Sequence, residues 1–173
     1  MMKNNHAFRL SRIWTPLVSF ICGALICVLS LTARNNKNAG PKIFAQKIVE
    51  ETLAAHPEIG GLELSATPPN MTDCVTIAGN DPSEIGEKCD KEDMTAMKTD
   101  SPFVEKETEN GKKIFAVTVP IHDPSGNVIG TAGIDFPRDS DSEQAKVTER
   151  AKQIGAELEA KLKSIEKMFE SVK

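Results

Sequence analysis

Hydrophobic residues are distributed unevenly along this chain, and the longest apolar run comes near its N terminus. From Ile13 to Ala33 the chain holds 21 residues without a charged side chain. About 20 such residues let a helix cross the hydrocarbon core of a bilayer. The run is apolar on all sides, whereas a helix on the surface of a soluble domain keeps one polar face. We therefore expect a transmembrane signal anchor over 13–33, after a short cytoplasmic tail over 1–12.

A cleaved signal peptide is the alternative for the same run. Cleavage requires small residues just before the cut, and the available pairs are Leu31 with Ala33 and Ser30 with Thr32. The apolar stretch of a cleavable signal is typically about 7 to 15 residues long, which is shorter than this one. The length of the run therefore favours the anchor.

Beyond a polar linker over 34–40, apolar and polar residues alternate with regular periods. Pro41 suits the first turn of a helix, and apolar side chains at helical spacing continue as far as His56. Turn residues and two-residue alternation then predict short strands, which begin near Leu62, Val75, Phe103, Lys113 and Val128. The pattern indicates one domain over 41–140, in which the last three strands form hairpins.

The segment 80–101 departs from this alternation. It contains Asp81-Pro82, Gly86 and the charge-dense stretch DKEDMTAMK, which can form a helical turn capped by Asp90. A connection longer than about 12 to 15 residues inside a compact domain is typically functional or disordered. We therefore expect this segment to contribute to a binding site.

The last predicted strand, VIGTAGIDF, carries an acid within an apolar pattern. Alternation along the strand places Thr131 and Asp135 on one face and Ala132 and Ile134 on the other. A carboxylate in such a place is costly unless it is solvated or paired. Either a ligand, a cation or water faces Asp135, or Asp135 lies at the end of the strand and accepts hydrogen bonds from loop amides.

The segment 141–173 is predicted to be an amphipathic C-terminal helix. Ser140 and Glu143 form a capping signature. The apolar residues that follow have a near-heptad spacing, at Ala151, Ile154, Leu158, Ile165, Met168 and Val172. This stripe either packs on its own domain or forms a two-chain coiled coil. Residues 142–173 are accordingly where we expect a homodimer contact or a partner receptor.

The two cysteines of the predicted domain indicate the cellular compartment in which it lies. Basic residues flank the apolar run on both sides, so the charge distribution does not orient it. The larger domain follows the run and holds Cys74 and Cys89, whose spacing fits neither a redox motif nor a zinc motif. Export would favour a disulfide between them, and two free buried thiols are the alternative. We expect a single-pass protein of the cell inner membrane with its domain in the periplasm or outside the cell.

Composition narrows the class of function. The chain has 173 residues, which is room for one modest domain and an appendage. Residues 34–173 carry 18 basic and 25 acidic side chains, a net charge of −7, and the whole chain has one Trp and no Tyr. Such a domain repels polyanions and lacks stacking platforms for bases, so nucleic acid is excluded as a partner.

Motifs of catalysis and metal binding are missing from the sequence. It contains no nucleophile elbow, no phosphate-binding glycine loop and no histidine cluster with the spacing of a metal site. We therefore expect no enzyme, no catalytic residues, no cofactor and no metal site.

Two stretches resemble a known family. The text VTVPIHDPSGNVIGTAGIDF over 117–136 resembles the closing hairpin of a Cache domain, the extracytoplasmic PAS-like sensor also called the PDC fold. The text CVTIAGNDPSEIGEKCDKEDM over 74–94 is similar to the second strand of that family and the loop after it. The resemblance extends over roughly 41–140 and implies one α+β domain. Its expected parts are a five-stranded antiparallel sheet, an N-terminal helix and a ligand pocket between the sheet and the long loop.

The resemblance also implies where a ligand binds. In members that recognise amino acids, an Asp on the last strand takes the amino group of the ligand, and Asp135 matches that place. The Tyr and Trp that accompany it in those members have no counterpart in the exported domain. We expect a small polar molecule as the ligand, and the other candidate ligand-binding residues, chosen by position, are Thr76, Asp81, Lys98, Thr118 and Thr131.

Two functions follow from these expectations. The first is a membrane-anchored extracytoplasmic sensor module for signal transduction, which binds a small ligand, has no output domain of its own and acts through a partner protein. The alternative is a structural or interaction protein of PAS-like shape that assembles through its C-terminal helix and binds no small ligand.

Overall fold

The computed structural model describes residues 42–109 and 111–172. The predictions for the tail, the anchor and the linker therefore lie outside the described residues. Within the described part, no helix is both long enough and apolar enough to span a bilayer. In chain order the elements are α1 (Phe44–Ala55), β1 (Gly61–Ala66), β2 (Val75–Gly79), α2 (Lys91–Thr99), β3 (Phe103–Glu109), β4 (Lys112–His122), β5 (Val128–Pro137), η1 (Asp141–Glu143), α3 (Gln144–Leu162) and α4 (Ile165–Met168).

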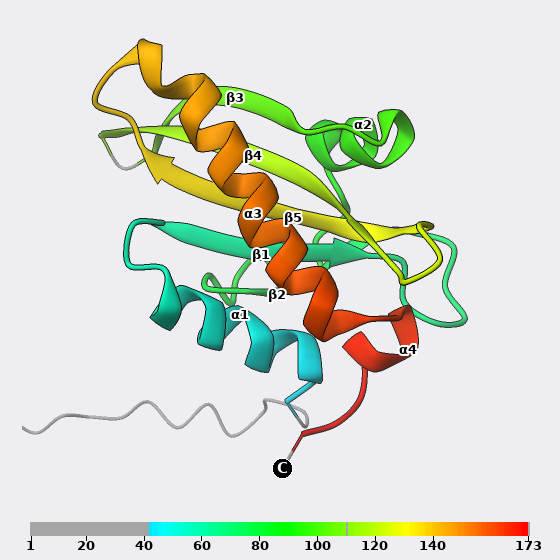
Figure 1. The fold of residues 1–173 in the computed structure, drawn as a ribbon. Helices are drawn as coiled ribbons and strands as arrows, with labels where there is room; N and C mark the ends of the chain where they lie inside the picture. The colour runs from blue at the N-terminus through cyan, green and yellow to red at the C-terminus, as the bar shows by residue number, and fades with distance from the viewer. Residues whose placement is uncertain (1–41, 110, 173) are drawn as a thin grey trace, which may run out of the picture. The chain divides into compact units, whose positions relative to one another are not determined.

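The strands form one antiparallel sheet in the order β2-β1-β5-β4-β3. The first two strands and the last three make separate hairpin-like units, and β1 joins them by pairing with β5. The predicted α+β class and the five-stranded antiparallel sheet are therefore confirmed. Strands distant in sequence, β1 and β5, lie side by side in the centre of the sheet (Figure 1).

One face of the sheet forms the hydrophobic core. Leu62 and Leu64 of β1, Val117 of β4 and Ile134 of β5 are almost completely buried there. Helices α1 and α3 cover this face (Figure 1). Gly155 lets α3 approach β4 closely, because a Cβ at this position would lie 3.1 Å from a methyl carbon of Val119. Burial of large side chains of this kind contributes about 1.5 to 3 kcal/mol each.

The apolar stripe of α3 packs on its own domain. Its buried residues are Ala151, Ile154, Gly155, Leu158 and Leu162, and all but the glycine belong to the hydrophobic core of the domain. Of the two alternatives for this stripe, the structure therefore shows packing within the chain. The side chains that would form a coiled-coil seam are already covered by the sheet.

The C-terminal segment contains the short 3-10 helix η1 and two α-helices, where the sequence predicted one helix. Helix α3 ends at Leu162, and Lys163 has a φ of +59° that interrupts the helical backbone. The Ser164 side chain then caps α4 by accepting a hydrogen bond from the backbone N–H of Lys167. The chain turns back toward α1, where the backbone N–H of Val172 donates to the carbonyl of Lys42 at 2.8 Å.

A disulfide closes the loop that borders β2. The predicted Cys74–Cys89 pair is bonded in the structure, with the two Cα atoms 5.3 Å apart. The backbone of the enclosed loop bonds to the outer edge of β2, since the Thr76 N–H donates to the carbonyl of Glu87 at 2.9 Å and the Gly86 N–H to that of Thr76 at 2.8 Å. The loop thereby satisfies backbone groups that an open edge strand would expose.

Helix α2 begins directly after the disulfide. Asp90 caps the helix, because its carboxylate accepts a hydrogen bond from the backbone N–H of Asp93 at 2.9 Å. The helix ends at Asp100, which adopts a left-handed conformation with a φ of +49°. The helical turn predicted within 80–101 is therefore confirmed, and the disulfide ties the start of α2 to the start of β2.

We predict that opening the disulfide destabilises the domain without preventing its cooperative unfolding. A loop whose cysteines are separated by 15 positions in the sequence corresponds to about 3 kcal/mol of unfolding free energy. Urea unfolding followed by far-UV circular dichroism should show this loss on adding a reductant. The double variant Cys74→Ser and Cys89→Ser is the control, because it should be destabilised equally and be insensitive to the reductant. An unchanged wild-type midpoint under reducing conditions would contradict the prediction.

Candidate functional site

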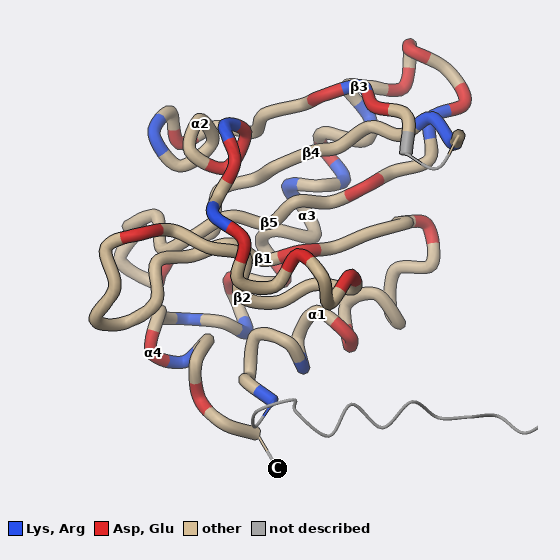
Figure 2. The backbone as a smooth tube through the Cα atoms, turned by 180° about the vertical axis from the view of Figure 1, so that it is seen from behind, with Lys and Arg blue, Asp and Glu red and all other residues tan. Residues whose placement is uncertain are grey.

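The face of the sheet opposite to α1 and α3 is lined by polar side chains. Because successive residues of a strand point to opposite faces, burial of Leu62 and Leu64 in the core turns Glu63 and Ser65 to the other side. On β5, burial of Ala132 and Ile134 in the core likewise turns Thr131, Gly133 and Asp135 to that side. Figure 2 views the sheet from this side, with acidic positions in red. We call this surface the polar face.

Strand register brings the polar residues into rows across the sheet. In the first row, Thr76 of β2 pairs with Ser65 of β1, and Ser65 pairs with Thr131 of β5. In the second row, Glu63 pairs with Gly133, and Gly133 pairs with Thr118 of β4. In the third row, Gly61 pairs with Asp135, which pairs in turn with Ala116. Residues from four strands therefore form one continuous polar surface.

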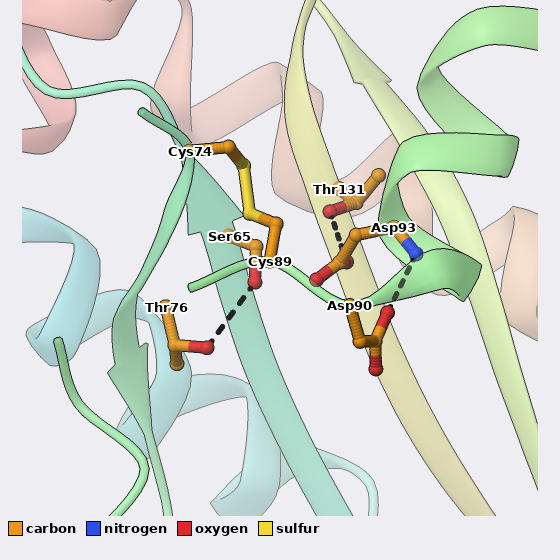
Figure 3. The surroundings of a disulfide bond; sticks show 7 residues. All are labelled: Ser65, Cys74, Thr76, Cys89, Asp90, Asp93 and Thr131. Carbon is orange, nitrogen blue, oxygen red and sulfur yellow. Dashed lines mark hydrogen bonds between the residues drawn. A yellow bond between two sulfur atoms is a disulfide. The ribbon is translucent and has the colours of Figure 1, made fainter. Parts of the chain in front are cut away.

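Helix α2 is attached to the polar face through a buried acid. The Asp93 residue is only 3% exposed, and its Oδ1 accepts a hydrogen bond from the Thr131 hydroxyl at 2.6 Å (Figure 3). Beside it, the hydroxyls of Ser65 and Thr76 lie 3.4 Å apart. Hydrogen bonds of this kind to a charged group stabilise by about 1.5 to 3 kcal/mol. The Asp93–Thr131 bond therefore holds α2 against β5.

Two glycines make room for the two acids of the central strands. A Cβ on Gly61 would lie 2.3 Å from Oδ2 of Asp135, and a Cβ on Gly133 would lie 2.9 Å from Oε1 of Glu63. Each carboxylate therefore lies over the glycine of the neighbouring strand. Any larger residue at Gly61 or Gly133 would displace a carboxylate from this arrangement.

Burial and neighbouring negative charges raise the pKa of Glu63 and of Asp93. Desolvation, as the largest cause, and the negative charges of Asp93, Glu84, Asp90 and Asp135, in that order, together raise the pKa of Glu63 to about 8. Burial also raises the pKa of Asp93, although hydrogen bonds from Thr131 and Ser65 oppose this change. At neutral pH, Glu63 is therefore mostly protonated. A positive group placed beside it would release this proton.

The structure brings four of the six sequence-predicted ligand residues together on the polar face, namely Thr76, Thr118, Thr131 and Asp135. The other two lie elsewhere. Asp81 is an exposed loop residue whose carboxylate accepts hydrogen bonds from the backbone and hydroxyl of Ser83 at 2.8 and 2.6 Å. Lys98 is exposed on α2.

Sequence reasoning missed Glu63 and Asp93 as members of this surface. The Leu62-Glu63-Leu64 alternation contained the signal for the first, since it places a lone acid opposite two apolar residues. No comparable signal exists for Asp93, because it lies in a stretch of mixed charges and becomes buried only through contact with β5.

Four hollows of the described part, of about 240 to 670 Å³, are bordered by residues of α3. None of these four is lined by Glu63, Asp93 or Asp135. Glu63 and Asp135 are nevertheless partly exposed, so a small molecule can reach them without a deep cavity. Within the described residues, no group of His, Cys, Asp and Glu has the geometry of a metal site.

We predict that Glu63 makes stability depend on pH. Its folded-state pKa of about 8 exceeds the ordinary 4.5, so between these values the folded state holds a proton that the unfolded state has released. The free energy of unfolding should therefore fall as the pH rises through this window. In a Glu63→Gln variant this part of the pH dependence should disappear, as thermal unfolding followed by circular dichroism at a series of pH values will show.

A matched control for this prediction is Glu105→Gln, which removes an exposed acid from β3. It should leave the pH dependence of the melting temperature unchanged. If Glu63→Gln retains the wild-type slope between pH 4.5 and about 8, burial of a neutral Glu63 is disproved.

Comparisons with known proteins place the fold but not the family. No family model matches the chain, and no curated protein matches it. Among solved structures, the chain is similar to the A. aeolicus nlh2 GAF domain in an inactive state, with a TM-score of 0.53 and 12% identity over 70% of this chain and 85% of that one.

Two further structures are similar to smaller degrees. The Agobacterium tumefaciens repressor BlcR has a TM-score of 0.46 and 12% identity, over 69% of this chain and 67% of that one. A light-oxygen-voltage domain has a TM-score of 0.36 and 13% identity, over 60% and 93% of the two chains. The sheet order and the GAF similarity together assign the described residues to a PAS/GAF-like fold.

Proposed function

We propose that this protein is a sensor module that binds a small organic cation on the polar face beside α2. The observation that carries the proposal is the pair of carboxylates, Glu63 and Asp135, laid over opposing glycines next to the buried Asp93. Burial raises the pKa of both Glu63 and Asp93, so their negative forms are unfavourable here unless a positive charge lies beside them. A ligand with an ammonium or guanidinium group supplies that charge.

Each residue of the polar face has a distinct part in such binding. The carboxylates of Glu63 and Asp135 accept hydrogen bonds from the N–H groups of the ligand. Thr76 on β2 and Thr118 on β4 lie on the two strands that flank β1 and β5, and they offer hydroxyls to a polar substituent. Asp93 already accepts a hydrogen bond from Thr131, so it holds α2 in place and adds negative potential. Binding of the cation displaces the proton of Glu63.

The finer part of the proposal is that the domain is a Cache-type sensor held at a membrane by residues 13–33. The charge-free run of 21 residues supports the anchor, and the Cys74–Cys89 disulfide supports an exported, oxidising setting. In this arrangement the domain lies in the periplasm or outside the cell. It transmits ligand binding through a partner protein that contacts the outer surface of 142–173.

A second function is favoured by one specific observation. Helix α2 lies directly on the polar face, where the Asp93–Thr131 hydrogen bond of 2.6 Å closes the space between them. A structural or interaction protein that keeps the PAS-like shape without a ligand would have this closed arrangement permanently. The two functions differ in whether the polar face takes up a cation.

Isothermal titration calorimetry of the full-length chain in detergent micelles tests the proposal. The probes are putrescine, agmatine, ethanolamine and arginine, with butanediol and succinate as uncharged and anionic counterparts. We expect one or more amines to bind and both counterparts to fail. Since a hydrogen bond to a charged group contributes about 1.5 to 3 kcal/mol, Asp135→Asn should weaken binding by roughly 10- to 100-fold. Glu149→Gln, which removes an exposed acid from α3 on the other side of the sheet, should bind as the wild type does.

Melting temperatures provide a second readout. A ligand present at about 100 times its dissociation constant adds about 2.7 kcal/mol to the free energy of unfolding. Circular dichroism is the suitable probe, because residues 42–172 contain neither Tyr nor Trp. If none of the amines raises the melting temperature of a cooperatively unfolding protein, the cation proposal is wrong and the ligand-free alternative is favoured.

A further inference from the structure

His122 connects two helices that cover opposite faces of the sheet. It is the last residue of β4, and its ring nitrogens each face a carboxylate. Nε2 lies 2.6 Å from Oδ1 of Asp100, the residue that ends α2. Nδ1 lies 2.6 Å from Oε1 of Glu159 on α3, and the backbone N–H of His122 donates to the same oxygen at 2.9 Å. We call these three residues the His122 bridge.

The end of β4 is placed so that both helices can reach it. Strand β3 begins only at Phe103, opposite Thr118, so the last residues of β4 extend beyond it. There, a hollow of about 240 Å³ lies between the end of α2 and the side of α3. Among the described residues, no other hydrogen bond or ion pair joins α2 or its C-cap to α3. The bridge is therefore the direct polar connection between the two helices.

The charge of the imidazole determines whether both contacts persist. Only the protonated ring has an N–H on each nitrogen, so only this form donates to both carboxylates. The hydrogen bond to Glu159 raises the pKa of His122 most, and Asp100 raises it further, whereas partial burial opposes them. The other charged groups nearby are Lys152, which lines the same hollow from α3, and Asp123, whose carboxylate is bonded within its own turn.

We propose that the His122 bridge couples α2 to α3, so that a displacement of α2 by a ligand on the polar face changes the position or mobility of the C-terminal helix. The ligand part of this inference rests on the proposed function. Asp93 holds one side of α2 on the polar face, and Asp100 connects its end to His122. A cation bound between Glu63 and Asp135 lies beside Asp93 and makes the net charge of the polar face under α2 less negative. A shift of α2 then moves Asp100, and the hydrogen bonds of His122 pass this displacement to Glu159 on α3.

The direction of the pH effect follows from the raised pKa. The bridge is complete below the ordinary His pKa of 6.5 and loses one of its two ring hydrogen bonds as the pH rises through the higher folded-state value. Coupling between α2 and α3 should therefore be strong in mildly acidic solution and weak in alkaline solution.

Hydrogen exchange measured by mass spectrometry on the full-length chain in detergent micelles, without ligand, tests the coupling. The change is Asp100→Asn, which alters only the α2 side of the bridge. At about pH 6, where the imidazole is charged, exchange in the α3 segment around Glu159 should become roughly two- to fivefold faster, as expected for a partly exposed ion pair. Lys98→Gln is the matched control on the same end of α2, and it should leave α3 unchanged.

Two further comparisons make the result decisive. In a His122→Gln background, Asp100→Asn should add no change in α3, because the connecting group is already lost. After correction for the intrinsic rate, the effect of Asp100→Asn should also vanish at a pH well above the His122 pKa that NMR titration gives, because the ring is neutral there. An effect confined to α2, one that persists in the His122→Gln background, or one equal at both pH values would overturn the proposal.

The imidazole itself provides an independent readout. NMR titration of the His122 ring should give a pKa above 6.5 that moves back toward this value in Asp100→Asn and in Glu159→Gln. An unshifted pKa in the wild type would also overturn the proposal. Because neither measurement uses a ligand, failure of every amine to bind would leave the coupling result standing, and absence of coupling would leave amine binding standing.

Discussion

The pairing of β1 with β5 in the centre of the sheet is the constraint on which the rest of the structure depends. It buries Leu62 and Leu64 in the core on one face. In the same register it sets Glu63 over Gly133 and Asp135 over Gly61 on the other. A slip by one residue would turn every side chain of a strand to the wrong face. The register that buries the hydrophobic core therefore also fixes the positions of the acids, and no further interaction is needed to place them.

The two faces of the sheet have opposite roles because their solvation differs. The apolar face is covered by α1 and α3 of the same chain, and the apolar residues of both helices are buried in this contact. The polar face is covered by α2, whose Asp93 adds another acid to a surface that already holds Glu63 and Asp135. Burial and mutual repulsion hold the pKa of Glu63 at about 8. Acids with a strongly perturbed pKa concentrate at functional sites, because a bound ligand can offset the desolvation and repulsion of their carboxylates.

A group that contacts helices on both faces of a sheet gives a ligand on one face a direct route to the helix on the other. Here α3 packs closely on the sheet, since even a Cβ added at Gly155 would lie 3.1 Å from Val119, and a closely packed interior deforms little. His122 lies at the end of β4, so it contacts both helices without a deformation of the sheet interior. A ligand can shift such a coupled pair only by as much as its affinity differs between the two arrangements. The free energy of the two His122 hydrogen bonds sets the upper limit of the coupling between α2 and α3.

The sequence left open whether Cys74 and Cys89 are paired, and the structure shows the disulfide. The sequence alone determined the strands, the helix after Pro41, the cap at Asp90 and the shared face of Thr131 and Asp135. These features depend on periodicity and turn chemistry within a few residues, and such signals are local. Only the tertiary structure decided that Asp93 meets Thr131, 38 residues away, and that His122 meets Glu159, 37 residues away. It also ended α3 at Leu162, where the sequence pattern continued. The physical reason is that burial and hydrogen bonding between distant segments depend on the register of β1 against β5, which no local pattern contains.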